Sequence, residues 1–215
     1  MTEIDRRRLV ALSLPLVVPI AMRATFAETR DRFGEQRGYL AGFGIYWASC
    51  AALTAGLIGP KRARALFRDR RPHPGRPALL AAALLLWPPA GAIATRFLPA
   101  RSAASPANLA TIGAVALANA TLEEALWRGV YISLWPDNPV LGWIWPAVGF
   151  GAWHVAPQVI HPSSMGLPAY VTAATALGLS WGWVAYRSRS LQWVAASHVL
   201  TDGSGIENAR YFFAG

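Results

Sequence analysis

The 215-residue sequence has few charged residues and a single cysteine. Charged side chains make up 14% of the chain, whereas soluble domains average about 25%. The lone cysteine, Cys50, excludes an internal disulfide, and no cysteine–histidine pair has the spacing of a structural zinc site. The sequence also has no internal repeat and no long linker. These absences argue against an ordinary soluble domain and favour one membrane domain over residues 1–215.

Hydrophobic residues make up 54% of the chain, and they gather in long runs. Mean hydropathy is only +0.30 because two charged loops dilute these runs. About 20 apolar residues span a bilayer as a helix. We therefore expect an all-α, polytopic membrane helix bundle with seven or eight spans, the eighth being a partial segment at the C-terminus. The seven predicted segments are 9–27, 38–59, 77–99, 107–135, 139–157, 166–187 and 190–206.

Several segments carry features that should modify their helices. The first follows Arg6–Arg8 and resembles a signal peptide, but further spans follow and 24–27 is a poor cleavage site, so we interpret it as an uncleaved helix. Pro88–Pro89 should kink or break the third segment. The fourth is long enough for a tilted span plus an extra turn. The last ends at Asp202–Gly203 and is short enough to stop partway across.

The net charge of +9 comes from basic residues in short loops between apolar segments. This distribution is typical of a membrane protein that follows the positive-inside rule, and not of a nucleic-acid-binding surface. Loops on the N-terminal side of the membrane carry the larger share of Lys and Arg, which predicts a cytoplasmic N-terminus. The basic, proline-rich stretch 60–77 is predicted to be a flexible cytoplasmic loop.

Three charged residues lie within the fourth apolar segment, where charge is costly and usually functional. Glu123 and Glu124 are adjacent and would point about 100° apart on a helix. Glu124 and Arg128 are four residues apart and can form an ion pair. Glu123 would then face a cavity, where burial makes a carboxylate a better base near neutral pH. The alternative is a structural ion pair with a spectator glutamate.

Two later apolar segments each carry one histidine. Phe150 and His154 share one helix face, and so do His198 and Asp202. A lone histidine in an apolar helix is more often a satisfied core residue than a catalyst. The His198–Asp202 spacing fits either a simple hydrogen bond or an imidazole whose tautomer is fixed by the carboxylate.

The combined order of these motifs is more specific than any one of them. Glu-Glu-x-x-x-Arg, Phe-x-x-x-His and His-x-x-x-Asp follow one another on successive hydrophobic segments. Together with the small-residue helix and basic turn at 177–198, this order resembles the CAAX prenyl protease and bacteriocin-processing (CPBP) family of intramembrane proteases. The resemblance covers a protease-like core at about 107–206 and leaves the first hundred residues without a family signature.

The resemblance implies a role for each motif residue. Glu123 would be the base that activates a water, and His198 would help to hold that water and act as acid or base in turn. His154 would face the developing oxyanion, where a pre-aimed donor contributes about 3 kcal/mol. The residues expected to support the site are Glu124, Arg128 and Phe150.

Asp202 leaves the mechanism open, since an ionised aspartate accepts hydrogen bonds but cannot donate to an oxyanion. It would be protonated, would orient His198, or would add a ligand to a metal. One mechanism is metal-free glutamate catalysis with no cofactor, which resemblance to the better-understood family members favours. The other is a Zn²⁺-type, metalloendopeptidase-like site that uses Glu123, His154 and His198.

The most consistent function is a hydrolase, an intramembrane endopeptidase that cuts peptide bonds near the membrane surface without a covalent intermediate. The sequence lacks a Gly-x-Ser-x-Gly run and a paired membrane aspartate dyad, which argues against serine and aspartyl intramembrane proteases. The chemistry leaves two alternatives: a non-catalytic scaffold or bacteriocin-immunity protein with the same fold, and a proton-relaying transporter.

The composition also bears on the partners and the cellular setting. The short, Ala/Arg/Trp-rich chain favours a prokaryotic cell membrane in a high-GC organism. A peptide or membrane-protein substrate is then favoured over a prenylated CAAX protein. The other expected partner is the lipid bilayer, and nucleic acid is not expected as a partner. The sequence carries no signal for an oligomeric state.

Overall fold

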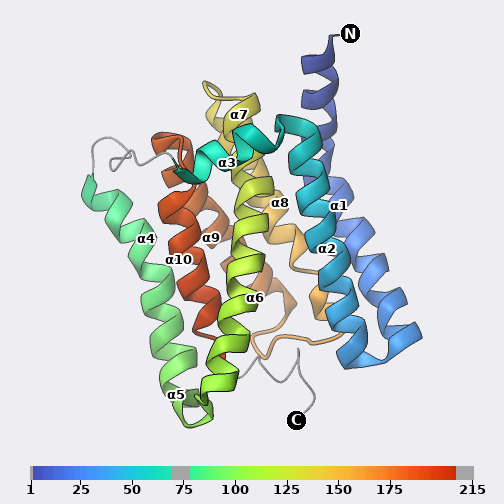
Figure 1. Ribbon diagram of the computed structural model, residues 1–215, viewed down its shortest axis with the longest axis vertical. Helices are drawn as coiled ribbons and strands as arrows, with labels where there is room; N and C mark the ends of the chain where they lie inside the picture. The colour runs from blue at the N-terminus through green and yellow to red at the C-terminus, as the bar shows by residue number, and fades with distance from the viewer. Residues whose placement is uncertain (1, 69–77, 207–215) are drawn as a thin grey trace.

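The computed structural model describes residues 2–68 and 78–206, apart from the side chain of Ala103, and these residues form helices and connecting turns without any strand (Figure 1). The predicted all-α class is therefore confirmed. The α-helices are α1 (Glu3–Phe33), α2 (Glu35–Ile58), α3 (Pro60–Arg68), α4 (Ala78–Ala92), α5 (Leu98–Ala100), α6 (Pro106–Glu124), α7 (Tyr131–Leu134), α8 (Trp145–Trp153), α9 (Leu167–Ser188) and α10 (Gln192–Gly203). The π-helical segments are η1 (Ile93–Phe97), η3 (Ala125–Val130) and η4 (Val140–Ile144), and the 3₁₀ turns are η2 (Arg101–Ala103) and η5 (Pro157–Val159).

Each of the seven predicted apolar segments contains a helix, but the helices differ in length. Within the described part of the chain, four are long and apolar enough to cross a membrane: Glu3–Phe33, Glu35–Ile58, Ala78–Ala100 and Pro106–Leu134. The helix α10 ends at Gly203 after 12 residues, about 18 Å at 1.5 Å per residue, which agrees with the predicted short last segment. A count of seven or eight crossings remains a prediction, and the partial C-terminal segment lies outside the described residues.

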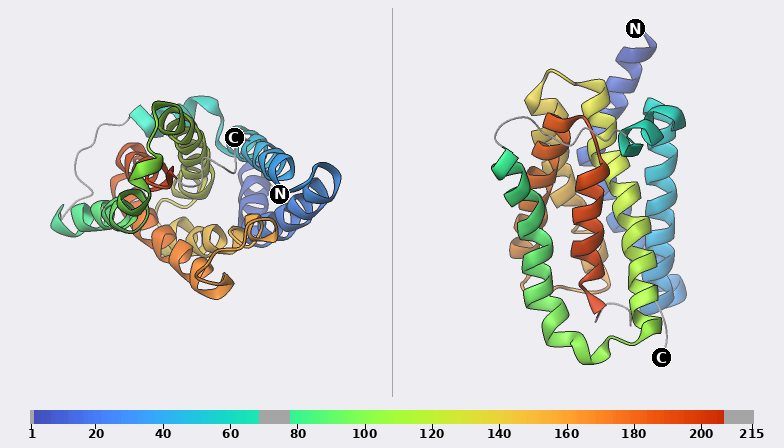
Figure 2. Two further views of the ribbon diagram at one scale, coloured as in Figure 1. Left: turned by 90° about the horizontal axis from the view of Figure 1, so that it is seen from below. Right: turned by 60° about the vertical axis from the view of Figure 1, so that its left-hand side comes forward.

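The helices pack side by side with their axes roughly aligned (Figures 1 and 2). Gly34, with φ of 77°, turns the chain between α1 and α2, and these two helices form an antiparallel hairpin. Helix α1 also packs on α8, and α10 packs between α4 and α6. The hairpin therefore lies at one edge of the bundle, and α4 lies at the opposite edge (Figure 2).

The centre of the bundle is rich in buried aromatic side chains. Phe26, Phe43, Tyr46 and Trp153 contact one another across α1, α2 and α8, and the rings of Tyr46 and Trp153 are stacked with centroids 3.6 Å apart. Many large apolar side chains instead point outward, as expected for helices surrounded by lipid acyl chains. They include Leu9, Leu16, Ile20, Leu79, Leu86 and Leu117.

The first helix is longer than the predicted segment 9–27 and continues through two prolines, Pro15 and Pro19. It begins at Glu3, where Thr2 forms a capping box with Asp5. The hydropathy pattern left the charged residues at both ends of this helix out of the predicted segment, although charged residues are compatible with a helix. Because proline has no N–H, the carbonyl of Ala11 loses its partner at Pro15, and the Tyr131 hydroxyl donates to that carbonyl at 2.8 Å.

The third segment was predicted to kink or break at Pro88–Pro89, and it does not break, because α4 continues through both residues to Ala92. Pro89 leaves the carbonyl of Leu85 without its helical donor. The Ser197 hydroxyl on α10 donates to this carbonyl at 2.6 Å, and Trp181 Nε1 on α9 donates to Ser197 Oγ at 2.9 Å. Neighbouring helices therefore supply the missing hydrogen bond, which is how membrane helices tolerate proline.

The stretch 60–77, predicted as a flexible loop, begins with a helix, α3 at Pro60–Arg68. Gly59, with φ of 80°, separates it from α2, and proline suits the first helical position. Leu66 is buried, and its carbonyl accepts a hydrogen bond from the Leu191 N–H at 2.9 Å. Leu66 therefore anchors this helix to the bundle, while the remainder of the predicted loop, 69–77, lies outside the described residues.

Candidate active site

Glu123 and Glu124 are the last two residues of α6, and the π-helical segment η3 follows them directly. π-Helical bulges occur frequently at functional sites. Both carboxylates are buried, with 1% and 0% of the residue exposed. Two carboxylates buried this deeply need compensating charges or donors, and the surrounding helices provide them.

Glu124 contacts two partners, one of which was predicted. Its Oε1 lies 3.0 Å from Arg128 Nη1, which confirms the ion pair expected from the spacing. The same oxygen lies 2.8 Å from Nδ1 of His198 on α10. Glu124 therefore connects the motif on α6 and η3 to the histidine on α10, as well as bracing its own helix.

The Arg128 side chain is buried and enclosed by aromatic rings. Its guanidinium carbon lies 4.1 Å from the centre of the Phe150 ring and 5.6 Å from that of Trp181. Cation–π contacts of this kind stabilise a desolvated arginine. Phe150 was predicted to support the site, and the structure places its ring against the Arg128 guanidinium. Its role in the site stays a prediction.

His198 lies between three carboxylates. While Nδ1 faces Glu124, Nε2 lies 3.5 Å from Glu123 Oε2 and 3.4 Å from Asp202 Oδ2. The predicted proximity of His198 and Asp202 is therefore found, and Glu123 joins them. An ionised carboxylate only accepts hydrogen bonds, so Nδ1–H donates to Glu124. Nε2 faces Glu123 and Asp202 at these longer distances and can exchange a proton with either carboxylate.

His154 is the C-cap residue of α8, and its ring is tied to its own helix. Nδ1 lies 2.7 Å from the Phe150 carbonyl oxygen. A carbonyl only accepts, so Nδ1 carries the proton and Nε2 of the neutral ring is an acceptor. His154 can donate to an oxyanion, as the resemblance implies, only when both of its nitrogens are protonated. Its ring also packs edge-on against Tyr170 of α9, with centroids 5.7 Å apart.

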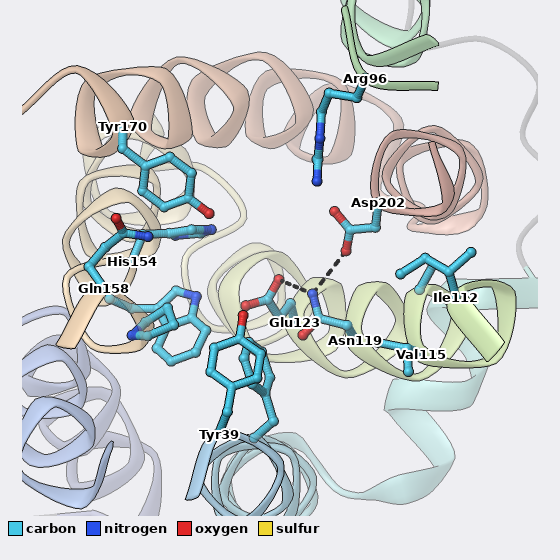
Figure 3. Close-up of a pocket in the computed structure, with 14 residues that line it drawn as sticks. Tyr39, Arg96, Ile112, Val115, Asn119, Glu123, His154, Gln158, Tyr170 and Asp202 are labelled. Atoms are coloured by element: carbon cyan, nitrogen blue, oxygen red, sulfur yellow. Dashed lines mark hydrogen bonds between the residues drawn. The ribbon is translucent and has the colours of Figure 1, made fainter. Parts of the chain in front are cut away.

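A cavity of about 130 Å³ lies beside these groups (Figure 3). Its wall includes three predicted site residues: Glu123, His154 and Asp202. His198 does not belong to this wall and is only 3% exposed, since it lies behind Glu123 and Asp202. Any effect of His198 on a molecule in the cavity therefore passes through these carboxylates. The polar side chains that complete the wall are Tyr39, Arg96, Asn119, Gln158 and Tyr170.

Two residues that were not predicted from the sequence contact Glu123 directly. The Tyr46 hydroxyl donates to Glu123 Oε1 at 2.7 Å, and Asn119 Nδ2 donates to Oε2 at 3.0 Å. The amide of Asn119 also donates to Asp202 Oδ2 at 3.0 Å (Figure 3). The contact of Asn119 could have been predicted from the sequence, because Asn119 precedes Glu123 by one helical turn. The contact of Tyr46 could not have been predicted in this way, because it joins positions 77 residues apart.

The zinc-type alternative requires three protein side chains placed around one ion. Its predicted ligands were Glu123, His154 and His198. Among the residues that the structure describes, no three His, Cys, Asp or Glu side chains are arranged to hold a metal ion.

The fold and the site together define a class, a helical membrane protein with a buried glutamate–histidine centre. Residues 105–204 match the family model described as Type II CAAX prenyl endopeptidase Rce1-like. The predicted resemblance to the CPBP proteases is thereby confirmed over this segment, which contains every predicted site residue. The match to a family of membrane proteases and the four long apolar helices identify an integral membrane protein. Searches of the curated proteins and of the solved structures found no match.

Proposed function

We propose that this protein is an intramembrane endopeptidase in which Glu123 activates water. The observation that carries this proposal is the position of Glu123: its carboxylate forms part of the cavity wall, is 1% exposed, and lies 3.5 Å from His198 Nε2. A buried carboxylate beside a group that can share its proton is suited to general acid–base catalysis. The match of residues 105–204 to an endopeptidase family supports the same reaction class.

In the proposed reaction, Glu123 takes a proton from a water molecule while the water oxygen attacks the peptide carbonyl carbon. The C–N bond of the resulting tetrahedral intermediate then breaks. The proton held by Glu123 passes to the leaving nitrogen, so that one water and one peptide give an acid and an amine. No bond forms between the protein and the peptide. His198 assists by sharing a proton with Glu123, while Glu124 keeps its ring in place.

We propose that His154 acts on the water, and that donors on the opposite wall face the oxyanion. The hydrogen bond from Nδ1 to the Phe150 carbonyl leaves Nε2 of His154 as an acceptor for a water proton. Arg96 and Tyr170 lie across the cavity from Glu123 and carry donor groups (Figure 3). Donors fixed in advance around a developing negative charge are among the largest contributions to catalysis.

We propose a metal-free reaction on a peptide or membrane-protein segment, in a prokaryotic cell membrane with the N-terminus in the cytoplasm and seven or eight spans. The arrangement of the His, Asp and Glu side chains around the cavity supports the metal-free form. The basic residues of α3 support the orientation, because they lie at the end of the bundle where α1 begins (Figure 1).

The experiment is cleavage of a library of fluorogenic peptides with apolar segments by the purified protein in detergent. Wild type is compared with Glu123→Gln and His198→Ala, each with and without a chelator, and with Glu35→Gln as a control on an exposed surface. We expect Glu123→Gln to lower kcat by at least about 100-fold and Glu35→Gln to leave it unchanged. Chelator should have no effect.

The other outcomes favour the alternatives. Activity that a chelator abolishes would favour a metal-dependent site. Activity unchanged in both site variants would contradict the assignment of Glu123 and His198. A wild-type protein that cleaves no peptide would favour the scaffold or immunity function, and proton flux across reconstituted vesicles would favour the transporter.

A further inference from the structure

Both oxygens of the Glu123 carboxylate are held by donors that the family motifs do not include. Oε1 accepts a hydrogen bond from the Tyr46 hydroxyl at 2.7 Å, and Oε2 accepts one from Asn119 Nδ2 at 3.0 Å. Tyr46 lies on α2, which precedes the matched segment 105–204. The carboxylate is therefore fixed from two directions by uncharged groups.

The Tyr46 hydroxyl has one possible orientation in this network. Trp127 Nε1, which can only donate, approaches the Tyr46 oxygen at 2.9 Å. The hydroxyl proton is thereby left for Glu123. The Tyr46 ring cannot move aside easily, because it is fully buried and stacked on Trp153 at 3.6 Å with an angle of 13° between the planes.

The Asn119 amide is oriented by the same helix. Trp47 Nε1 donates to Asn119 Oδ1 at 2.9 Å, which requires the amide oxygen on the α2 side and the NH₂ group on the opposite side. The two amide hydrogens then go to Glu123 Oε2 and Asp202 Oδ2, each at 3.0 Å. Trp47 thus determines the orientation of the amide that holds both carboxylates.

We propose that Tyr46 and Asn119 are positioning residues for Glu123, and that Trp47 acts through Asn119. Two adjacent residues of α2 would then fix the two oxygens of the proposed base, one directly and one through an amide. This inference rests on the proposed function of Glu123. It gives the α1–α2 hairpin, which lies outside the matched segment, a direct part in the reaction.

A positioning role differs from a purely structural one in what it does to catalysis. A base displaced by about 1 Å can lose about 100-fold in rate without a change in substrate affinity. A structural contact between α2 and α6 would instead contribute to stability alone. The comparison therefore needs a second buried tyrosine that makes one hydrogen bond away from the cavity. Tyr131, whose hydroxyl donates to the Ala11 carbonyl at 2.8 Å, has these properties.

The experiment measures kcat and KM for Tyr46→Phe and Tyr131→Phe with the peptide that wild type cleaves fastest in the fluorogenic library. Each change removes one buried hydroxyl and keeps the ring, so both should lower the unfolding temperature. We expect Tyr46→Phe to lower kcat by about 10–100-fold with KM within about twofold of wild type. We expect Tyr131→Phe to leave kcat within about twofold. Equal effects of the two variants on kcat would overturn the proposal.

A second readout does not depend on cleavage. Infrared spectra of wild type minus Glu123→Gln isolate the carboxyl bands of Glu123. We expect Tyr46→Phe to shift these bands because it removes a donor to Glu123. We expect Trp47→Phe to shift them because it frees the Asn119 amide, which also donates to Glu123. Tyr131→Phe should leave the bands in place. Bands that do not move in Tyr46→Phe would overturn the proposal even if no peptide were cleaved. If Glu123→Gln still cleaved peptide while the bands shifted as expected, the proposed function of Glu123 would be contradicted. The hydrogen bonds to its carboxylate would still be supported.

Discussion

Arg128 and Glu124 form a charge pair that has no access to water. Their side chains are 2% and 0% exposed, and the pair lies next to His198. We expect Glu124→Gln to lower the free energy of unfolding by about 3–5 kcal/mol, because it leaves the buried arginine charge without its carboxylate partner. Adding Arg128→Met should recover most of this loss, since the apolar side chain can occupy the same site over Phe150. Unfolding in a denaturant titration of the detergent-solubilised protein measures both effects.

A matched control for this pair lies at the surface. Glu3 and Arg7 have the same spacing of four residues and a 3.0 Å contact, but both are largely exposed. Exposed ion pairs contribute little, so Glu3→Gln should leave the unfolding curve unchanged. A double variant as unstable as Glu124→Gln alone would mean that the burial of the arginine charge is not the cause.

At the residue scale, the sequence predicted contacts within one helix better than contacts between helices. The pair Glu124–Arg128 and the proximity of His198 to Asp202 followed from a spacing of four residues, and both were found. The contact of Glu124 with His198 and that of Tyr46 with Glu123 join helices far apart in the chain. No local spacing encodes such contacts, because they depend on how the helices pack.

Helices of this bundle contain prolines whose missing hydrogen bonds are supplied by a neighbouring helix. The Leu85 carbonyl, freed by Pro89, accepts from Ser197 Oγ. We expect Ser197→Ala to lower the free energy of unfolding by about 1–3 kcal/mol, because it leaves a partly buried carbonyl without a donor. In a Pro89→Ala background, the N–H of residue 89 can donate to the Leu85 carbonyl. Ser197→Ala should then lower the free energy of unfolding by clearly less. A double-mutant cycle on the free energy of unfolding measures the difference.

Pro88 provides the control for this cycle. Pro88 is adjacent to Pro89 and also buried. In a helix, however, the N–H that would donate to the Leu85 carbonyl belongs to residue 89 and not to residue 88. A Pro88→Ala background should therefore leave the cost of Ser197→Ala unchanged. If the two backgrounds gave the same cost, the hydrogen bond from Ser197 would not be a substitute for the helical one.

The helices α8 and α9 approach closely at Gly151. A Cβ atom there would lie 1.8 Å from Thr175 Oγ1 and 3.0 Å from Thr175 Cα. We expect Gly151→Ala to destabilise the protein by about 1–3 kcal/mol, because the two helices must separate. Gly113 on α6 has open space around it, so Gly113→Ala should be neutral or stabilising by up to about 1 kcal/mol. Thermal unfolding of both variants tests this, and equal effects would contradict the close approach.

At the element scale, the hydropathy pattern located the helices but not their irregular parts. The predicted segments 166–187 and 107–135 correspond closely to α9 at Leu167–Ser188 and to the helix at Pro106–Leu134. The pattern missed the helix α3 because a basic stretch with one buried leucine has no long apolar run. It also predicted a kink or break at Pro88–Pro89. It could not show that the helix continues, because the compensating hydrogen bond comes from a residue more than a hundred positions away.

The whole molecule positions its cavity toward one end of the bundle. The wall includes Tyr39 near the start of α2, Arg96 near the end of the third long helix, and Tyr170 near the start of α9. These three residues lie near chain reversals at the end that carries the α1–α2 turn. The basic helix α3 lies at the opposite end (Figure 1). The membrane orientation therefore determines which compartment the cavity faces.

A cytoplasmic N-terminus places α3 in the cytoplasm and the α1–α2 turn on the outer side. The only native cysteine, Cys50, is buried, so new cysteines can be labelled selectively in a Cys50→Ala background. Glu35 at the α1–α2 turn and Lys61 on α3 are both exposed. We expect a membrane-impermeant maleimide to label Glu35→Cys in intact cells, and Lys61→Cys only after permeabilisation. The reverse pattern would place the cavity toward the cytoplasm and would make cytoplasmic peptides the first substrates to test. Labelling of both sites in intact cells would contradict a membrane-spanning α2.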